Sequence, residues 1–111
     1  MSYDLLRSEE QALKKARDTV FPFAVTGYLL HPIIVGMVAF GTIYHHVKAD
    51  PVTNRFADGH TIRTSPIAGF ILHDGFLVLN TRNSLYVCVM READKAVLIN
   101  TIRSLPKPTY H

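Results

Sequence analysis

Tryptophan is absent from the sequence and cysteine occurs once, at Cys88, so no internal disulfide can form. The residues around Cys88 are apolar (Tyr86-Val87-Cys88-Val89), which predicts a buried thiol and not an accessible nucleophile. The sequence also has no glycine-rich phosphate-binding loop and no hydrophobic signal segment near its start. These absences favour a protein of a reducing cytoplasm.

Charge of either sign is sparse. The formal net charge is +3, and only 19% of the residues are charged. Residues 1–19 balance four positive side chains against four negative ones, whereas residues 48–111 carry eight positive and five negative. So small an excess does not predict a nucleic-acid-binding protein, which presents a dense basic face. With 48% hydrophobic residues among 111, we expect a single domain over residues 1–111.

Charge is missing altogether from the 29 residues Thr19–Val47, a run long enough to cross a membrane. Three glycines and two prolines interrupt it, and a helix broken so often would need neighbours for its freed backbone groups. The β-branched and aromatic content predicts instead two buried strands, about Phe23–Leu30 and Ile33–Val47, with a break at His31-Pro32. A single membrane span and a short buried helix starting at Pro32 are the alternatives.

Helical patterns lie at both ends of the chain. Leu6, Leu13 and Val20 recur every seven residues among charged neighbours, which predicts an amphipathic helix over residues 1–19. A second helix is expected over residues 91–105, with an apolar stripe that includes Val97, Leu98 and Ile102, and Pro106 ends it. Residues 106–111 would form a short tail.

Between these helices, short apolar runs alternate with turn signals. Ile67–Leu72, Phe76–Leu79 and Leu85–Met90 are separated by an Asp-Gly turn and by Thr81-Arg82-Asn83-Ser84, the pattern of an antiparallel meander. The predicted fold class is α+β: an N-terminal helix, a curled antiparallel β-sheet of four or five strands within residues 20–90, and a C-terminal helix.

The segment Arg55–Pro66 is the densest in residues with backbone roles. Asp58-Gly59 is a turn signal, and Ser65-Pro66 ends the strand pattern because proline has no N–H to donate. Polar residues of this segment and of the later turn form the candidate binding surface. They either bind nucleic-acid phosphates or are ordinary solubilising charges with no binding role. The candidates are Arg55, Asp58, His60, Arg63 and Arg82.

Catalytic and metal-binding patterns are lacking. His45 and His46 are adjacent, so in a strand they point to opposite faces and cannot easily bind one ion. The other four histidines lie at turns or at the terminus. Ser65 precedes a proline and lacks the flanking glycines of a nucleophile elbow. We therefore expect no enzyme activity, no metal and no cofactor.

Two sequence motifs within about residues 41–90 resemble motifs of other proteins. Arg55-Phe56-Ala57-Asp58-Gly59 continues to Ile62 and Thr64-Ser65-Pro66, and Thr81-Arg82-Asn83-Ser84-Leu85-Tyr86 follows later. Both are similar to sequence motifs in small uncharacterised proteins of proteobacterial phages, prophages and plasmids. The resemblance implies a mobile-element protein in the cytoplasm of a host cell.

With no catalytic residues and an apolar excess, the expected function is non-catalytic binding that blocks a host or defence protein, as anti-CRISPR inhibitors do. Unpaired edges of so apolar a sheet also predict a homodimer. The alternatives are a nucleic-acid-binding or regulatory module that uses an arginine rim, and a small single-span membrane protein.

Overall fold

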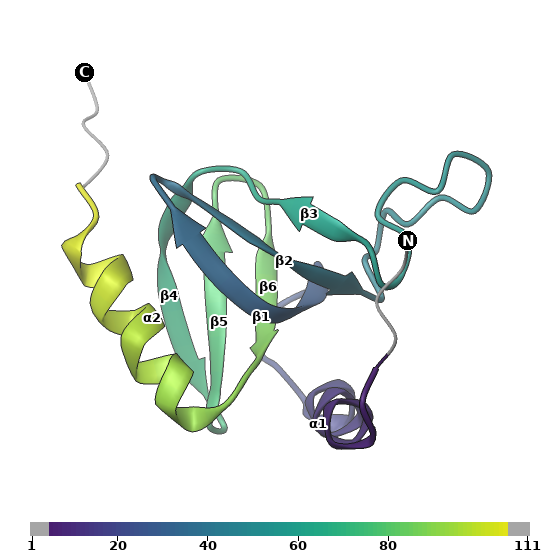
Figure 1. Cartoon of the computed structure of the whole chain (residues 1–111), viewed down its shortest axis with the longest axis horizontal. Helices are drawn as coiled ribbons and strands as arrows, with labels where there is room; N and C mark the ends of the chain where they lie inside the picture. Colours follow the sequence, from purple (N-terminus) through teal and green to yellow (C-terminus); the bar gives the residue numbers. More distant parts are fainter. Residues whose placement is uncertain (1–4, 107–111) are drawn as a thin grey trace.

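The computed structural model describes residues 5–106 and has an α+β fold, as predicted (Figure 1). The first four residues of the predicted N-terminal helix and residues 107–111 of the predicted tail lie outside the described part. The elements are α1 (Arg7–Asp18), β1 (Gly27–Val35), β2 (Val38–Tyr44), β3 (Thr61–Arg63), β4 (Ile67–His73), β5 (Phe76–Thr81), β6 (Leu85–Val89) and α2 (Glu92–Ser104).

The sheet has six strands in the order β3-β2-β1-β6-β5-β4. Neighbouring strands are antiparallel except for β1 and β6, which run parallel, with Gly27–Leu30 beside Tyr86–Val89. The strand number and this parallel pair differ from the prediction of four or five antiparallel strands. Short turns join β1 to β2, β4 to β5 and β5 to β6 and fix their antiparallel direction, whereas the longer segment 45–60 leads from β2 to β3 and no turn connects β1 to β6. Their direction therefore depends on tertiary packing.

The predicted break at His31-Pro32 is wrong, because β1 runs through it. Leu30 pairs with Thr42 and Ile33 with Phe40, so His31 and Pro32 together oppose Gly41 and form a bulge. His31 takes a left-handed φ of 48°, and a bulge tolerates the proline that a regular ladder would not.

The chain reverses instead at Gly36, where φ is 61°. The uncharged run Thr19–Val47 is therefore a loop followed by a β-hairpin, and neither a membrane helix nor a short buried one forms there. No helix within residues 5–106 has both the length and the apolar character needed to cross a bilayer.

The sheet curls so that the β1–β2 hairpin and strands β4–β6 enclose a common core, which α2 completes on the β4 side (Figure 1). The turn of the β1–β2 hairpin is joined to the start of β4, where the Ile67 N–H donates to the Met37 carbonyl at 2.7 Å. Side chains from the β1–β2 hairpin, from β4–β6 and from α2 fill this core: Leu29, Ala39, Ile43, Ile67, Leu77, Leu79, Tyr86, Cys88, Leu98 and Ile102.

Helix α1 packs on the other face of the sheet. Leu13 and Ala16 are buried against Leu30, Val78 and Val87. The seven-residue spacing predicted that Leu6 and Val20 also belong to this helix. That part of the prediction is wrong, because the helix starts only at Arg7 and ends at Asp18. Leu6 and Val20 therefore lie outside the helix, and both are exposed.

Candidate protein-binding cleft

Three of the five candidate residues lie in the segment that leads into β3. The Asp58 carboxylate accepts the His45 N–H at 2.8 Å, and the His60 carbonyl accepts the Ile43 N–H at 2.9 Å. The Arg55 guanidinium lies 5.0 Å from the centre of the Phe56 ring. The Asp58 side chain and the His60 main chain thus fasten this segment to the end of β2.

Arg63 and Arg82 lie at the other end of β3. The Arg82 N–H donates to the Pro66 carbonyl at 2.9 Å, and the Asn83 N–H donates to Ser65 Oγ at 3.3 Å. The two sequence motifs that carry the resemblance thus lie in contact. The hydrogen bonds between them are local and hold two turns together, so the structure divides the five candidates into two groups and forms no single binding cluster from them.

His46 is a buried structural residue that the sequence did not identify. Its ring stacks on Phe56 with 4.0 Å between centroids, Nδ1 accepts the Lys48 N–H at 3.0 Å, and Nε2 lies 3.3 Å from the Tyr86 hydroxyl. Burial, and then the charges of Lys48 and Arg55, lower the pKa of His46. Within residues 5–106, no group of three or more histidine, cysteine or acidic side chains is placed to hold a metal ion.

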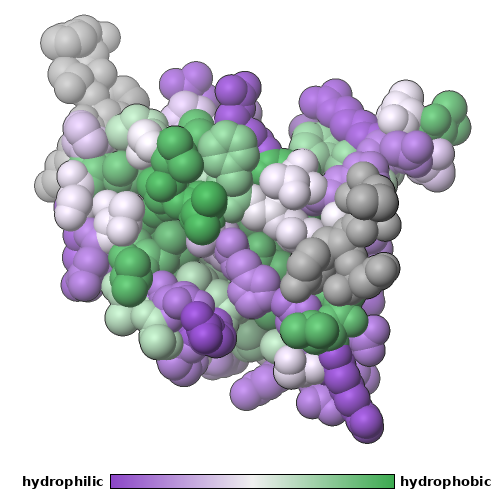
Figure 2. All heavy atoms as spheres, in the orientation of Figure 1, coloured by the Kyte–Doolittle hydropathy of each residue, from purple (hydrophilic) through white to green (hydrophobic). Residues whose placement is uncertain are grey.

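An apolar cleft of about 390 Å³ lies between β1 and α2. We call it the β1–α2 cleft; its lining residues are His31, Pro32, Ile33, Ile34, Met90, Asp94, Val97, Leu98 and Thr101. Ile33 and Val97 on its rim are 61% and 66% exposed, and Val35 beyond it is 56% exposed. Figure 2 shows hydrophobic atoms gathered on this face around the end of the β1–β2 hairpin.

The cleft exists because β1 leaves β6 after Leu30. Parallel pairing with β6 ends at that residue, while pairing with β2 continues to Val35. The second half of β1 thus has no neighbouring strand on its α2 side in the described part of the chain.

The main chain of Ile34 faces this open side. Ile34 is opposite Ala39, whose N–H and carbonyl both bond Thr64, on the β3 side of β2. In an antiparallel ladder, two opposite residues point their main-chain groups either toward each other or both outward. The N–H and carbonyl of Ile34 are therefore directed away from β2 and toward α2.

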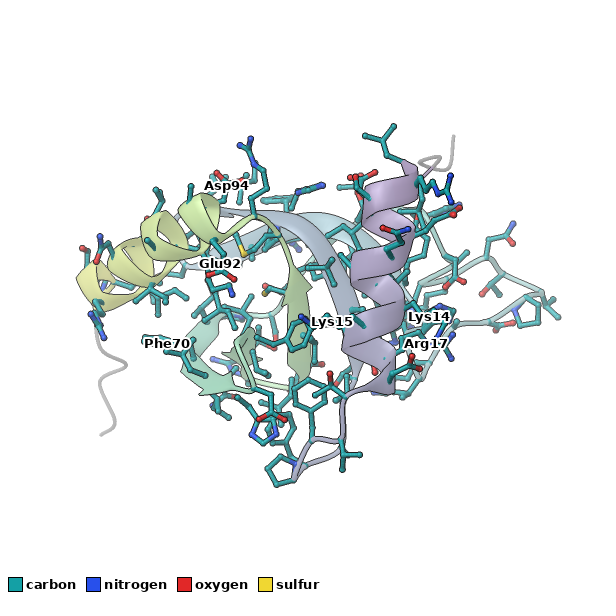
Figure 3. All side chains as sticks on the ribbon, turned by 90° about the horizontal axis from the view of Figure 1, so that it is seen from below. Lys14, Lys15, Arg17, Phe70, Glu92 and Asp94 are labelled. Carbon is teal, nitrogen blue, oxygen red and sulfur yellow. The ribbon has the colours of Figure 1, made fainter. Side chains whose placement is uncertain are left out.

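Paired polar side chains close the end of the cleft nearest α1. His31 Nε2 lies 2.5 Å from Glu9 Oε2, and the Arg91 guanidinium donates to Asp94 at 2.9 Å. That hydrogen bond, more than the charge of Arg91, holds the pKa of Asp94 below its usual range. Figure 3 shows Asp94 in the first turn of α2, with the sheet between this helix and α1. Because these polar groups are paired with each other, the rest of the cleft offers an apolar surface and a free strand edge.

Sequence reasoning placed the candidate site elsewhere and missed this cleft. The available signal was the run Ile33-Ile34-Val35, three consecutive apolar residues in a strand, of which one face stays exposed unless something covers it. Comparison with protein-family models, with curated proteins and with solved structures gives no match in any of the three. The site must therefore be interpreted from its own geometry.

Proposed function

We propose that this chain is a non-catalytic protein-binding protein of a mobile genetic element. It binds and blocks a host or defence protein in the host cytoplasm, in the manner of an anti-CRISPR inhibitor. The observation that carries the proposal is the β1–α2 cleft, in which the exposed side chains of Ile33 and Val97 flank the outward-directed main chain of Ile34. An exposed apolar groove of this kind is typical of interaction sites.

The occupant that fits is an extended, apolar segment of the target protein. Such a segment adds to a free strand edge through main-chain hydrogen bonds, and its alternate side chains enter the neighbouring groove. Here Ile34 supplies one donor and one acceptor, and Met90 and Leu98 line the groove. Full burial of an exposed aliphatic side chain contributes about 1.5–3 kcal/mol, so covering Ile33 and Val97 is a substantial source of affinity.

The test compares capture by three variants with capture by the unmodified chain. The tagged proteins are incubated with lysate of a proteobacterial host, and bound proteins are quantified by mass spectrometry. Ile33→Lys and Val97→Lys place a charge on the rim of the cleft and should abolish capture of the specific partner. Val52→Lys is the matched control, because Val52 is 89% exposed in the loop before β3 and does not line the cleft.

All three variants should keep the thermal unfolding midpoint of the unmodified chain, since the replaced side chains are exposed. Equal capture by Val97→Lys and Val52→Lys, or capture of no partner by any form, would count against the proposal. A gel-shift titration across salt concentrations covers the rival reading: nucleic-acid affinity that falls steeply with added salt would replace protein binding as the function.

A further inference from the structure

The six-stranded sheet ends in β3 on one side and β4 on the other. In the described part of the chain, each of these strands pairs with one strand only, although at the start of β4 the Ile67 N–H donates across the open side to the Met37 carbonyl. Free strand edges pair readily with other chains, and proteins guard them with short length, charge, proline or bulges. The two edges of this sheet differ in how they are guarded.

Strand β3 is a guarded edge. It has only three residues, Thr61–Arg63, and the side chain of Arg63 is exposed. Pro66 follows shortly after the strand, so the ladder cannot be extended in that direction. Such an edge offers too little regular backbone for a second chain to pair with.

Strand β4 is less guarded, although α2 packs against its Phe70 face. It spans seven residues, and Ile67–Leu72 contains no charged residue and no proline. Ile71 and Leu72 are 38% and 56% exposed, on opposite faces of the strand. One irregularity lies near its start, between Ile67 and Gly69, and the pairing with β5 is regular from there to His73.

The main chain of β4 presents hydrogen-bonding groups to the open side. The Thr81 N–H bonds the Ser84 carbonyl, and the alternation along β5 then directs the main chain of Leu77 and Leu79 toward β6. Leu72 lies opposite Leu77, and Phe70 lies opposite Leu79. Because those β5 groups bond β6, the N–H and carbonyl groups of Phe70 and Leu72 point outward from the sheet.

We infer that β4 pairs antiparallel with β4 of a second copy, so that two sheets join into one of twelve strands. Antiparallel pairing of a strand with itself is self-complementary and closes with two-fold symmetry. Phe70 of each copy would exchange main-chain hydrogen bonds with Leu72 of the other, which places Ile71 of one copy opposite Ile71 of the second, on the dyad. No charge in Ile67–Leu72 opposes this arrangement. The inference is independent of the proposed function, since it uses a different edge.

The register gives a test with two opposite substitutions at one position. Opposed residues of an antiparallel pair have Cα atoms about 4.5–5.5 Å apart, which is within the range that a disulfide spans. Ile71→Cys should therefore form a disulfide-linked dimer under mild oxidation, and the buried native Cys88 should not interfere. Ile71→Lys places two like charges on the dyad and should weaken dimerisation at least tenfold in sedimentation equilibrium.

The same substitutions at exposed Thr61, on the edge strand β3, are the matched controls. Thr61→Cys should give no comparable cross-linking, and Thr61→Lys should leave the dimer intact. A monomeric mass for the unmodified chain over the micromolar range would overturn the inference. So would a dimer that survives Ile71→Lys, or one that dissociates only with Thr61→Lys. The pull-down with the cleft variants is unaffected by these results, so the two proposals can fail separately.

Discussion

Glu9 and His31, 22 positions apart in the chain, are joined by a contact of 2.5 Å between Oε2 and Nε2. The other carboxylate oxygen of Glu9 accepts the Leu6 N–H at 2.9 Å, at the residue that caps α1. Glu9 is only 8% exposed. One buried carboxylate therefore fixes both the start of the N-terminal helix and the bulge at which β1 leaves β6, so it positions the wall of the β1–α2 cleft.

Replacement of Glu9 by alanine should lower the free energy of unfolding by about 1–3 kcal/mol, because it removes the carboxylate that accepts the Leu6 N–H and contacts the His31 ring. Glu10→Ala removes an exposed acid from the same helix turn and should change the stability by less than about 0.5 kcal/mol. Urea unfolding followed by circular dichroism measures both. Equal losses in the two variants would contradict a specific role for Glu9.

Local signals explain why much of the fold was predictable. The turn between β4 and β5 has positive φ at Asp74 and Gly75, 49° and 81°, which is what an Asp-Gly pair in a two-residue hairpin favours. Pro106 likewise ends the C-terminal helical pattern close to where α2 stops. By contrast, the sequence near His31-Pro32 gives equal support to a break and to a bulge. At the bulge His31 contacts Glu9, a partner from another element that no local pattern indicates.

The candidate site was less predictable, and Val97 shows why. Helical periodicity placed both Val97 and Leu98 in the buried stripe of α2, yet only Leu98 is buried. Consecutive helical residues point about 100° apart, so one of them stays near the rim of the contact. Which one it is depends on the position of β1 after it leaves β6, and that position is a property of the whole sheet.

Gly41, opposite the bulge in β1, should be among the least replaceable residues of the sheet. A Cβ there would lie 2.7 Å from Leu29 Cγ and 3.1 Å from the Leu30 carbonyl oxygen. Gly41→Ala should therefore lower the free energy of unfolding by about 1–3 kcal/mol through overpacking. A Cβ on Gly69 would meet no atom of residues 5–106 within 4 Å, so Gly69→Ala should be neutral or stabilise by about 0.5 kcal/mol. Denaturant melts measure both variants. Equal unfolding midpoints for the two would contradict the close packing of β1 against Gly41.

Cys88 should be chemically inert in the folded chain. It is 1% exposed in the central strand β6, and burial raises the pKa of its thiol to about 12. Since the thiolate is the reactive form, an aromatic disulfide reagent at neutral pH should modify it only after denaturation. A Val52→Cys variant, with an added thiol at an exposed position, should react with one equivalent in the native state. Rapid modification of the unmodified native chain would show that β6 is not buried.

The stability of the fold should depend on pH through His46. Burial, first, and the nearby charges of Lys48 and Arg55 lower the folded-state pKa of His46 below its ordinary value of about 6.5. Protonation of Nδ1 would also break its hydrogen bond with the Lys48 N–H. Above about pH 6.5 this histidine is neutral in both states. As the pH falls below that value, the unfolded chain takes up a proton at this position more readily than the folded chain, so the free energy of unfolding declines.

His46→Asn isolates this contribution, because an asparagine oxygen can accept the Lys48 N–H in place of Nδ1 but does not titrate. The variant loses the stacking on Phe56 and should be less stable near pH 7.5. Its disadvantage relative to the unmodified chain should shrink between about pH 7 and pH 5, and both proteins contain the other five histidines. Urea melts across this range measure the difference. A stability gap that stays constant or widens on acidification would mean that His46 holds its proton as easily in the fold as in the unfolded chain.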